Sequence, residues 1–132
     1  MKINIRRARR SDLKELIKLD KISNQEISWW NPLTTSEFLR LLNRGLVYVA
    51  EQEEIIAYLN GDIKEKELIL DNLYVKKEFR KKDIARKLIE KFLVDFKKRF
   101  KRVRLDCPER MKDFYEQFGF KTTALIMQKE LR

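Results

Sequence analysis

The stretch Val75-Lys-Lys-Glu-Phe-Arg-Lys-Lys-Asp-Ile-Ala85 decides the fold of this 132-residue chain. It joins an apolar segment, Leu68 to Val75, to a segment in which apolar residues recur every three or four positions, Ile84 to Phe100. These patterns predict a strand followed by a long helix with one core-facing stripe. The first N–H groups of a helix have no partner within it, and the helix dipole favours negative charge there. With its added Lys and Arg charges, the junction predicts a phosphate-binding site.

The same strand belongs to two predicted pairings. Leu46 to Ala50, Ile55 to Ile63 and Leu68 to Val75 alternate with short polar turns and predict an antiparallel meander. A further strand, Arg102 to Cys107, follows the long helix and predicts a parallel partner reached by a right-handed crossover. The other predicted elements are a strand Ile3 to Ala8, a helix capped by Ser11 and Asp12 that continues to about Ser23, a helix Ser36 to Asn43, a helix Met111 to Phe118 and a last strand Leu125 to Leu131.

We therefore predict one α/β domain over residues 1–132, with a mixed sheet, an antiparallel N-terminal meander, a central parallel strand pair and about four helices. No apolar run approaches the roughly 18 residues that a membrane span requires. A single cysteine, with no signal-peptide core at the start, fits a reducing cytoplasm. Many Lys, Glu and Ile with three Gly resemble a thermophile's composition.

The chain contains no histidine. This excludes Ser–His–Asp and Cys–His catalysis, and it excludes most catalytic zinc sites, so no metal is implied. Any proton transfer must use carboxylates, Tyr, Lys, Cys, the backbone or water.

The net charge of +10 is confined to one part of the sequence. Lys76 to Arg104 holds 14 Lys or Arg and 4 Asp or Glu, and the remainder of the chain is neutral. This concentration is typical either of a solvated helix face or of a site for a polyanion, which would be a phosphorylated cofactor or nucleic acid.

With two motifs in this order of elements, the chain resembles the GNAT superfamily of N-acetyltransferases, and in style the branch that acetylates ribosomal proteins. The family signature at the strand-to-helix turn is Gln or Arg, two residues, Gly, one residue, then Gly or Ala. The turn here is Arg80-Lys81-Lys82-Asp83-Ile84-Ala85. The second motif is Phe114-Tyr115-(x)3-Gly119-Phe120, which is similar to the family segment whose tyrosine faces the sulfur of coenzyme A.

The resemblance implies acetyl-CoA as acyl donor and assigns its contacts. The backbone of Leu73 and Val75, on either side of Tyr74, should pair with the pantetheine arm. The N–H groups of residues 80–85 should surround the pyrophosphate. The residues expected to bind the cofactor are thus Leu73, Tyr74, Val75, Arg80, Lys81, Lys82, Asp83, Ile84, Ala85 and Arg86.

Asp83 departs from the family signature, which has glycine at this position. Asp tolerates positive φ better than most residues do. Its carboxylate could also cap the N–H groups that the pyrophosphate needs, and its charge opposes phosphate. The nearby cations outnumber that one anion, so cofactor binding is expected to survive.

The chemistry requires a neutral amine, stabilisation of the developing oxyanion and a proton for the leaving thiolate. Tyr115 is the predicted proton donor, and backbone N–H groups at Leu73 to Val75, if a bulge splays them, could hold the oxyanion. Asp106 is the preferred base by resemblance, although the loop that follows it is shorter than in the ribosomal branch. Asp71 is the second candidate, and deprotonation through water is the third.

Other reactive or large side chains have simpler interpretations. Cys107, without histidine and within an apolar strand, is expected to be a buried small residue. Trp29, Trp30 and Pro32 lie in the segment that lines the acceptor groove in the resembled family. Core packing and contact with substrate both remain open for the two tryptophans.

The leading hypothesis is transfer of an acetyl group from acetyl-CoA to a primary amine by direct reaction in a ternary complex. The acceptor would be a protein N-terminus, a lysine or a small amine. Two alternatives stay open: a non-catalytic module that binds acyl-CoA as a sensor, and one that binds nucleic acid or an acidic partner through the basic loop and helix. Aromatic residues do not interleave with the basic face, so nucleic acid is not favoured.

Overall fold

Five strands form one sheet in the order β1-β2-β3-β4-β5. The structure is a computed structural model that describes residues 2–26 and 31–132. The strands are β1 Asn4–Arg7, β2 Val47–Gln52, β3 Glu54–Lys64, β4 Glu67–Val75 and β5 Val103–Arg104. Neighbours from β1 to β4 are antiparallel, whereas β5 runs parallel to β4. The predicted meander and the predicted parallel pair are both confirmed.

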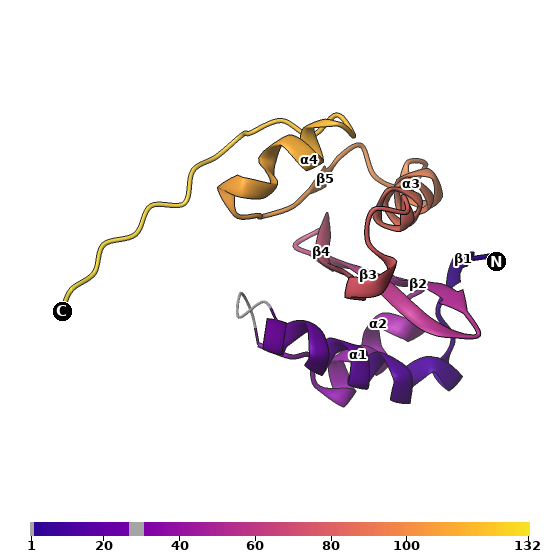
Figure 1. The fold of residues 1–132 in the computed structure, drawn as a ribbon. Helices are drawn as coiled ribbons and strands as arrows, with labels where there is room; N and C mark the ends of the chain where they lie inside the picture. The colour runs from indigo at the N-terminus through magenta and orange to yellow at the C-terminus, as the bar shows by residue number, and fades with distance from the viewer. Residues whose placement is uncertain (1, 27–30) are drawn as a thin grey trace.

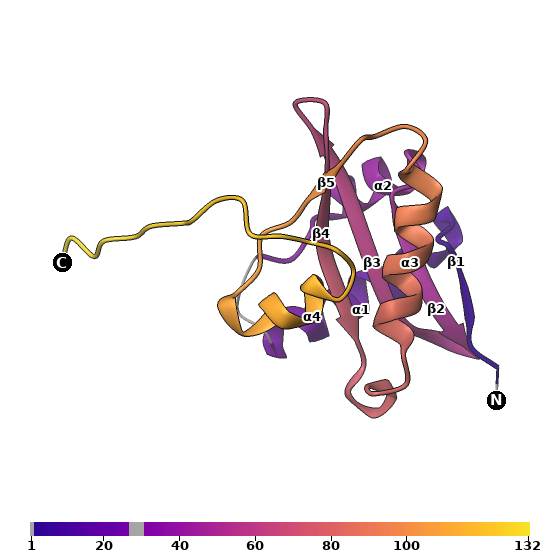
Figure 2. The same cartoon turned by 90° about the horizontal axis from the view of Figure 1, so that it is seen from above.

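Helices cover both faces of the sheet (Figure 1). In the described residues there are four α-helices, α1 Leu13–Glu26, α2 Thr35–Asn43, α3 Ile84–Phe96 and α4 Lys112–Glu116. The first two lie on one face and α3 lies on the other, with β5 and α4 beside it (Figures 1 and 2). The sheet with its four helices confirms the predicted α/β class.

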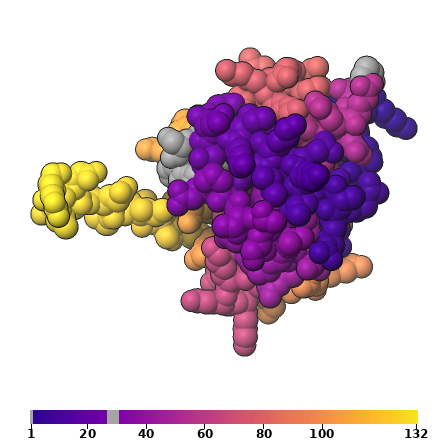
Figure 3. Space-filling view, turned by 90° about the horizontal axis from the view of Figure 1, so that it is seen from below, coloured from indigo at the N-terminus to yellow at the C-terminus, as the bar shows by residue number. Residues whose placement is uncertain are grey.

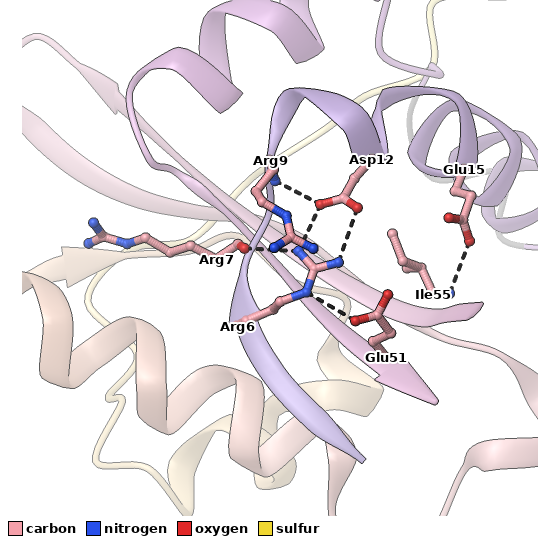
Figure 4. Close-up of polar contacts among 7 residues, drawn as sticks. All are labelled: Arg6, Arg7, Arg9, Asp12, Glu15, Glu51 and Ile55. Atoms are coloured by element: carbon pink, nitrogen blue, oxygen red, sulfur yellow. Dashed lines mark hydrogen bonds and ion pairs between the residues drawn. The ribbon is translucent and has the colours of Figure 1, made fainter. Parts of the chain in front are cut away.

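The start of α1 differs from the prediction. A short 3-10 helix, Arg10–Asp12, precedes α1, and Asp12 does not cap it. The buried Asp12 carboxylate instead accepts hydrogen bonds from the Arg9 N–H at 2.7 Å and from Arg6 at 2.8 and 3.1 Å (Figure 4). Arg6 also donates to Glu51 at 3.2 Å, so this clasp joins β1, the 3-10 helix and β2. The Asp12 carboxylate thus binds the backbone N–H at the start of the 3-10 helix and the Arg6 guanidinium, instead of capping α1.

The cap of α2 is local and complete. Thr34 accepts a hydrogen bond from the Glu37 N–H at 3.0 Å, while Glu37 accepts one from the Thr34 N–H at 2.9 Å. This reciprocal pair satisfies two donors at the helix start. Gly45, with φ of 69°, follows the last turn as predicted and turns the chain into β2.

The core lies between the sheet and the helices on both sides. The predicted stripe of α3 is buried, and its members Ile84, Leu88, Ile89, Phe92 and Phe96 are less than 3% exposed. The helix ends at Phe96, earlier than the predicted Phe100, although the N–H groups of Arg99 and Phe100 still donate to the Phe96 carbonyl oxygen. Among the described residues, every buried hydrophobic residue lies between Leu16 and Phe96.

The chain after Phe96 contains less regular structure than predicted. Only Val103 and Arg104 of the predicted strand from Arg102 to Cys107 pair with β4. The predicted last strand, Leu125 to Leu131, is wrong, since residues 120–132 form neither helix nor strand and extend away from the body (Figures 2 and 3). An alternating sequence becomes a strand only where another strand supplies hydrogen-bond partners, and residues 120–132 meet no strand edge in this structure.

Candidate functional site

The two parallel strands of the sheet separate almost at once. Their register contains two pairs, Leu68 with Val103 and Ile69 with Arg104. From Leu70 to Val75 the outer edge of β4 therefore has no strand partner in the described chain, although its inner edge is paired with β3 at every residue except Asp71. Unpaired backbone N–H and C=O groups on a strand edge bind an extended amide chain readily. The predicted pairing of Leu73 and Val75 with a pantetheine arm would use this edge.

A β-bulge lies on β4 close to the point where the strands separate. Asn60 of β3 faces Asn72 and Gly61 faces Leu70, which leaves Asp71 without a partner. From the sequence, a bulge at Leu73 to Val75 was one possibility, and the structure has a bulge two residues earlier, at Asp71. Two buried amides hold it, because Asn72 donates to the Asn60 side chain at 2.8 Å.

Glycine is required opposite the bulge for a steric reason. A Cβ atom on Gly61 would lie 2.5 Å from the Phe92 ring and 3.0 Å from the Ile69 carbonyl oxygen. The close approach of α3 to β3 therefore depends on the missing side chain. This contact sets the position of α3, whose N-terminus forms the next part of the site.

The loop before α3 has the geometry expected of an anion site. Lys81 and Asp83 both have positive φ, 65° and 62°, so Asp83 adopts the left-handed conformation for which the family uses glycine. The Asp83 side chain makes no capping hydrogen bond, and its carboxylate lies 3.7 Å from Arg86 Nε. The N–H groups of the first turn of α3 are thus not taken up by Asp83. Backbone N–H groups around such alternating conformations form a concavity for anions.

Arg80 has a different position from the one that a phosphate ligand would need. Its Nε donates to the Val75 carbonyl oxygen at 2.9 Å, and its guanidinium lies over the Tyr74 ring at 5.4 Å. Its terminal nitrogen pairs with Glu26 at 2.6 Å, and Tyr74 donates to the same carboxylate at 2.9 Å. Hydrogen bonding from Arg80 lowers the pKa of Glu26. Arg80 thus ties the end of β4 to α1, and Lys81 and Lys82 are the exposed cations of the loop.

Glu26 was missed by the sequence analysis. It lies 54 positions before Arg80, and no local pattern links the two residues. The only available signal was the opposite charge of the two side chains, which many other pairs in this chain share.

Tyr115 lies on α4, which is held against the start of α3. Arg86 donates to Gln117 at 3.2 Å and its guanidinium lies over the Phe118 ring at 5.5 Å. Burial, with the Cys107 thiol as a weaker cause, raises the pKa of Tyr115 to about 12. The phenol therefore remains protonated at neutral pH, as a proton donor must. Cys107 is half-buried, and burial raises the pKa of its thiol as well, which opposes a role as nucleophile.

The two carboxylates considered as bases lie near each other. The Asp71 side chain is exposed, yet the protein around its carboxyl partly desolvates it and raises its pKa. The negative charges of Asp62 and Asp106 add to this effect, while Lys64 opposes it. Asp106 follows β5 where it separates from β4, and Asp71 is the bulged residue on β4. The structure therefore brings both candidates to the opening between β4 after Ile69 and the chain after Arg104, which we call the fork. Trp29 and Trp30 lie outside the described residues, and Pro32 is exposed.

No helix in the part of the chain that the structure describes is both long and apolar enough to cross a membrane. No three of the His, Cys, Asp and Glu side chains in residues 2–26 and 31–132 are grouped so that they could hold a metal ion.

Comparison with known proteins identifies similar folds and one matching family. Residues 43–122 match the family model of the acetyltransferase (GNAT) domain. No curated protein sequence matches the chain. A predicted acetyltransferase from Clostridium acetobutylicum, solved with acetyl-CoA, is 19% identical with a TM-score of 0.77, over 98% of this chain and 97% of that chain.

Two further solved structures have named activities. Glucosamine-6-phosphate N-acetyltransferase from Arabidopsis thaliana is 22% identical with a TM-score of 0.71, over the full length of both chains. An aminoglycoside acetyltransferase from an uncultured soil metagenomic sample, solved with sisomicin, is 18% identical with a TM-score of 0.72, over 98% of this chain and 97% of that chain. At these identities the likeness shows the fold alone.

Proposed function

Because this chain belongs to the GNAT family of acetyltransferases, we propose that it moves an acetyl group from acetyl-CoA to a primary amine by direct transfer in a ternary complex. The observation that carries the proposal is the fork between β4 and β5, which opens beside the uncapped N-terminus of α3. An unpaired strand edge and an anion site adjoin there, and acetyl-CoA carries both an amide-rich arm and a pyrophosphate.

The donor would be held mainly by backbone groups. The open edge of β4 at Leu73 and Val75 pairs with the pantetheine arm, and the N–H groups of Lys81 to Ala85 contact the pyrophosphate. Lys81 and Lys82 add positive charge at the same loop. Arg80 and Tyr74 act indirectly, because their contacts with Val75 and Glu26 fix where the strand ends and the loop begins.

Acetyl-CoA supplies the activated acyl group as a thioester, and the protein supplies proton transfer. Asp106 and Asp71 supply the carboxylates of the fork that can accept a proton. An ammonium acceptor would be attracted there by their negative charge and would lose a proton to one of them. The raised pKa of Asp71 improves its strength as a base. Tyr115 assists the departing thiolate. Its pKa of about 12 is roughly 3 units above that of a free thiol, so it acts chiefly by donating a hydrogen bond to the sulfur.

The test is an assay of free coenzyme A release with acetyl-CoA and a panel of acceptors, namely a peptide N-terminus, a peptide lysine and a small polyamine. Release should require one of these amines. Tyr115→Phe should lower kcat by about 100-fold, because the departing thiolate would lose a positioned hydrogen-bond donor, which contributes a factor of this order. Asp113→Asn, an exposed acidic residue on the same helix, is the matched control and should be unchanged.

Three outcomes would count against the proposal. An unchanged kcat in Tyr115→Phe would contradict the role of the phenol. Full activity in Asp71→Asn, Asp106→Asn and the double variant would contradict the proposal that a carboxylate is the general base. Saturable acetyl-CoA binding without any amine-dependent release would make the protein a sensor and not an enzyme.

A further inference from the structure

Much of the excess positive charge lies in a segment that the proposed donor site does not use. Residues 97–104 have the sequence Lys-Lys-Arg-Phe-Lys-Arg-Val-Arg, with six cations and no acidic residue. All six cations are exposed. They follow the end of α3, whereas the proposed pyrophosphate site is at its start, and the 13 residues of the helix separate the two by about 20 Å. The segment is therefore a second basic surface, distinct from the first.

The charge of this segment is not neutralised within the described chain. In residues 2–26 and 31–132, Arg104 is the only one of the six cations that forms an ion pair, with Glu67 at 3.6 Å. Asp95, the last acidic residue of α3, already accepts a hydrogen bond from Tyr48 at 2.8 Å and lies 3.6 Å from Lys91. The remaining positive charge is thus available to an anionic partner.

An apolar groove lies among these cations. It has a volume of about 230 Å³ between the end of α3 and β5, and Lys97, Lys101 and Arg102 are part of its lining. Figure 2 shows the chain turning back from this end of α3 toward β5. The rest of the lining, which we group with the three cations as the α3–β5 groove, is apolar and consists of Leu68, Leu93, Val94, Phe96, Phe100 and Val103.

The apolar lining is open to a partner at one residue in particular. Val94 is 58% exposed, although it lies on a helix whose other large apolar side chains are buried or half-buried. An apolar side chain from a partner would cover Val94 and remove it from water. The groove therefore offers both an apolar contact and positive charge to the same ligand.

Two occupants fit this combination poorly. Nucleic-acid bases stack on open aromatic faces, but Phe96 is buried, Phe100 is half-buried and the Arg99 guanidinium lies over both rings, at 5.3 and 5.5 Å. A second copy of this chain would bring a net charge of +10 toward the same cations and be repelled. The chemistry favours a ligand with apolar side chains flanked by carboxylates.

We propose that the α3–β5 groove is a docking site for an acidic, amphipathic segment of a partner protein. One or two of its apolar side chains enter the groove over Val94, and its Asp and Glu side chains pair with Lys97, Lys101 and Arg102. An amphipathic helix that inserts its apolar face into a groove of this kind is a common mode of peptide recognition. The site lies outside the proposed donor site, so docking and acetyl transfer can occur on the same molecule.

The first experiment measures fluorescence anisotropy of a labelled peptide titrated with the full chain. The probe is a helical peptide with two leucines on one face and Asp and Glu around them, and the control peptide has serine in place of each leucine. The leucine peptide should bind saturably with a Kd below about 100 μM, and the serine peptide at least about 5-fold more weakly. Binding of the leucine peptide should weaken between about 0.05 and about 0.5 M salt, because the ion pairs are exposed.

Three variants locate the contact. The double variant Lys97→Glu, Lys101→Glu should raise the Kd at least about 10-fold, because two attractive pairs become repulsive. Val94→Ser should raise it about 3-fold or more, because it removes apolar surface from the groove. The matched control is Lys14→Glu, Lys18→Glu, which makes the same change of charge at exposed positions of α1 on the opposite face of the sheet, and it should bind like the wild type.

The second experiment separates this groove from the proposed donor site and from a nucleic-acid site. Coenzyme A should not displace the leucine peptide, and a single-stranded RNA of equal charge should compete weakly. The proposal would be overturned by any one of four results: no saturable binding of the leucine peptide, equal binding of the serine peptide, unchanged binding in the Lys97→Glu, Lys101→Glu variant, or displacement by coenzyme A. RNA that binds more tightly than the peptide would also overturn it, since the surface would then be a nucleic-acid site. Because the peptide assay requires no acetyl-CoA, its result is independent of whether the chain proves to be an acetyltransferase.

Discussion

The chain up to Phe96 and the chain after it are built in different ways. The first region contains all of the buried hydrophobic residues described, the four antiparallel strands β1 to β4 and the Arg6–Asp12 clasp (Figure 4). The second region contains a two-residue strand, a 3-10 helix at Glu109–Met111, the short helix α4 and an extended C-terminal segment, with no buried residue among those described. The first region is thus stabilised by its own core, whereas the second depends on contacts with other parts of the molecule and, we propose, with ligand and partner.

This difference locates function at the boundary. The proposed donor site uses the end of β4 and the start of α3, both in the first region, while Tyr115 and Asp106, the residues proposed for proton transfer, belong to the second. A weakly packed segment can adjust when a ligand fills the fork, and regions of low local stability commonly serve this purpose. Substitutions in the two regions should therefore have different consequences, and three comparisons test this.

The largest effect is expected at the aromatic centre of the first region. Phe92 is fully buried and packs edge-on against Tyr48 at 6.0 Å and beside Phe96 at 5.1 Å. Phe92→Ala should lower the free energy of unfolding by about 3–5 kcal/mol, because it removes a buried ring and leaves a cavity. Urea denaturation followed by far-ultraviolet circular dichroism measures this. A loss below about 1 kcal/mol would mean that the core is not continuous through α3.

The clasp in the first region should show an intermediate, pH-dependent effect. The Arg6 hydrogen bonds lower the pKa of Asp12 from its usual 3.8. A carboxyl with a lowered folded pKa adds stability above its unfolded pKa and loses it as pH falls through the folded value. Arg6→Leu, which removes the ion-pair partner of a buried carboxylate, should cost about 3 kcal/mol at pH 7.

The cost of the same substitution should fall as pH is lowered from 4 to 2, because protonation of Asp12 removes the wild-type advantage. Denaturation series at pH 7, 4 and 2 provide the measurement, and Arg10→Leu, a solvent-exposed neighbour, provides the control. A difference between wild type and Arg6→Leu that is independent of pH would contradict the ionic role of the clasp.

The smallest effect on stability is expected in the second region. Phe118 is half-exposed and contacts Arg86 and the Phe114 ring. Phe118→Ala should cost less than about 1 kcal/mol without ligand, in contrast to the same change at Phe92. It should raise KM for acetyl-CoA several-fold, because α4 loses a contact with the start of α3. A large loss of stability without ligand would show that the second region is part of the core.

The fold was predictable where the sequence pattern is local. The meander, the buried stripe of α3 and the parallel crossover follow from apolar spacing that short windows reveal. Asp tolerates positive φ better than most residues do, so a left-handed conformation at Asp83 was compatible with the sequence. The structure shows this conformation, and the Asp83 side chain makes no capping hydrogen bond. The positions of α3 and β4, and hence of the fork, could thus be predicted to within a few residues.

The errors arise from contacts distant in sequence or from missing partners. Asp12 pairs with Arg6 and with the start of the 3-10 helix instead of capping α1. Arg80 pairs with Glu26 instead of facing the loop, because a tertiary ion pair holds its guanidinium. Residues 125–131 have strand periodicity but no strand edge beside them, so periodicity alone could not produce a strand. The place of the bulge depends on the buried Asn60–Asn72 pair, which no local pattern reveals.

The central claim is that the fork between β4 and β5, with the uncapped start of α3, binds acetyl-CoA. Hydrogen exchange of the full chain, measured with and without saturating acetyl-CoA, tests it directly at individual amides. The account predicts slower exchange at the amides of residues 73–75 and 81–86, with Lys2 to Arg7 unchanged as the internal reference. Binding that leaves those amides exchanging at the same rate, or no binding at all, would contradict it.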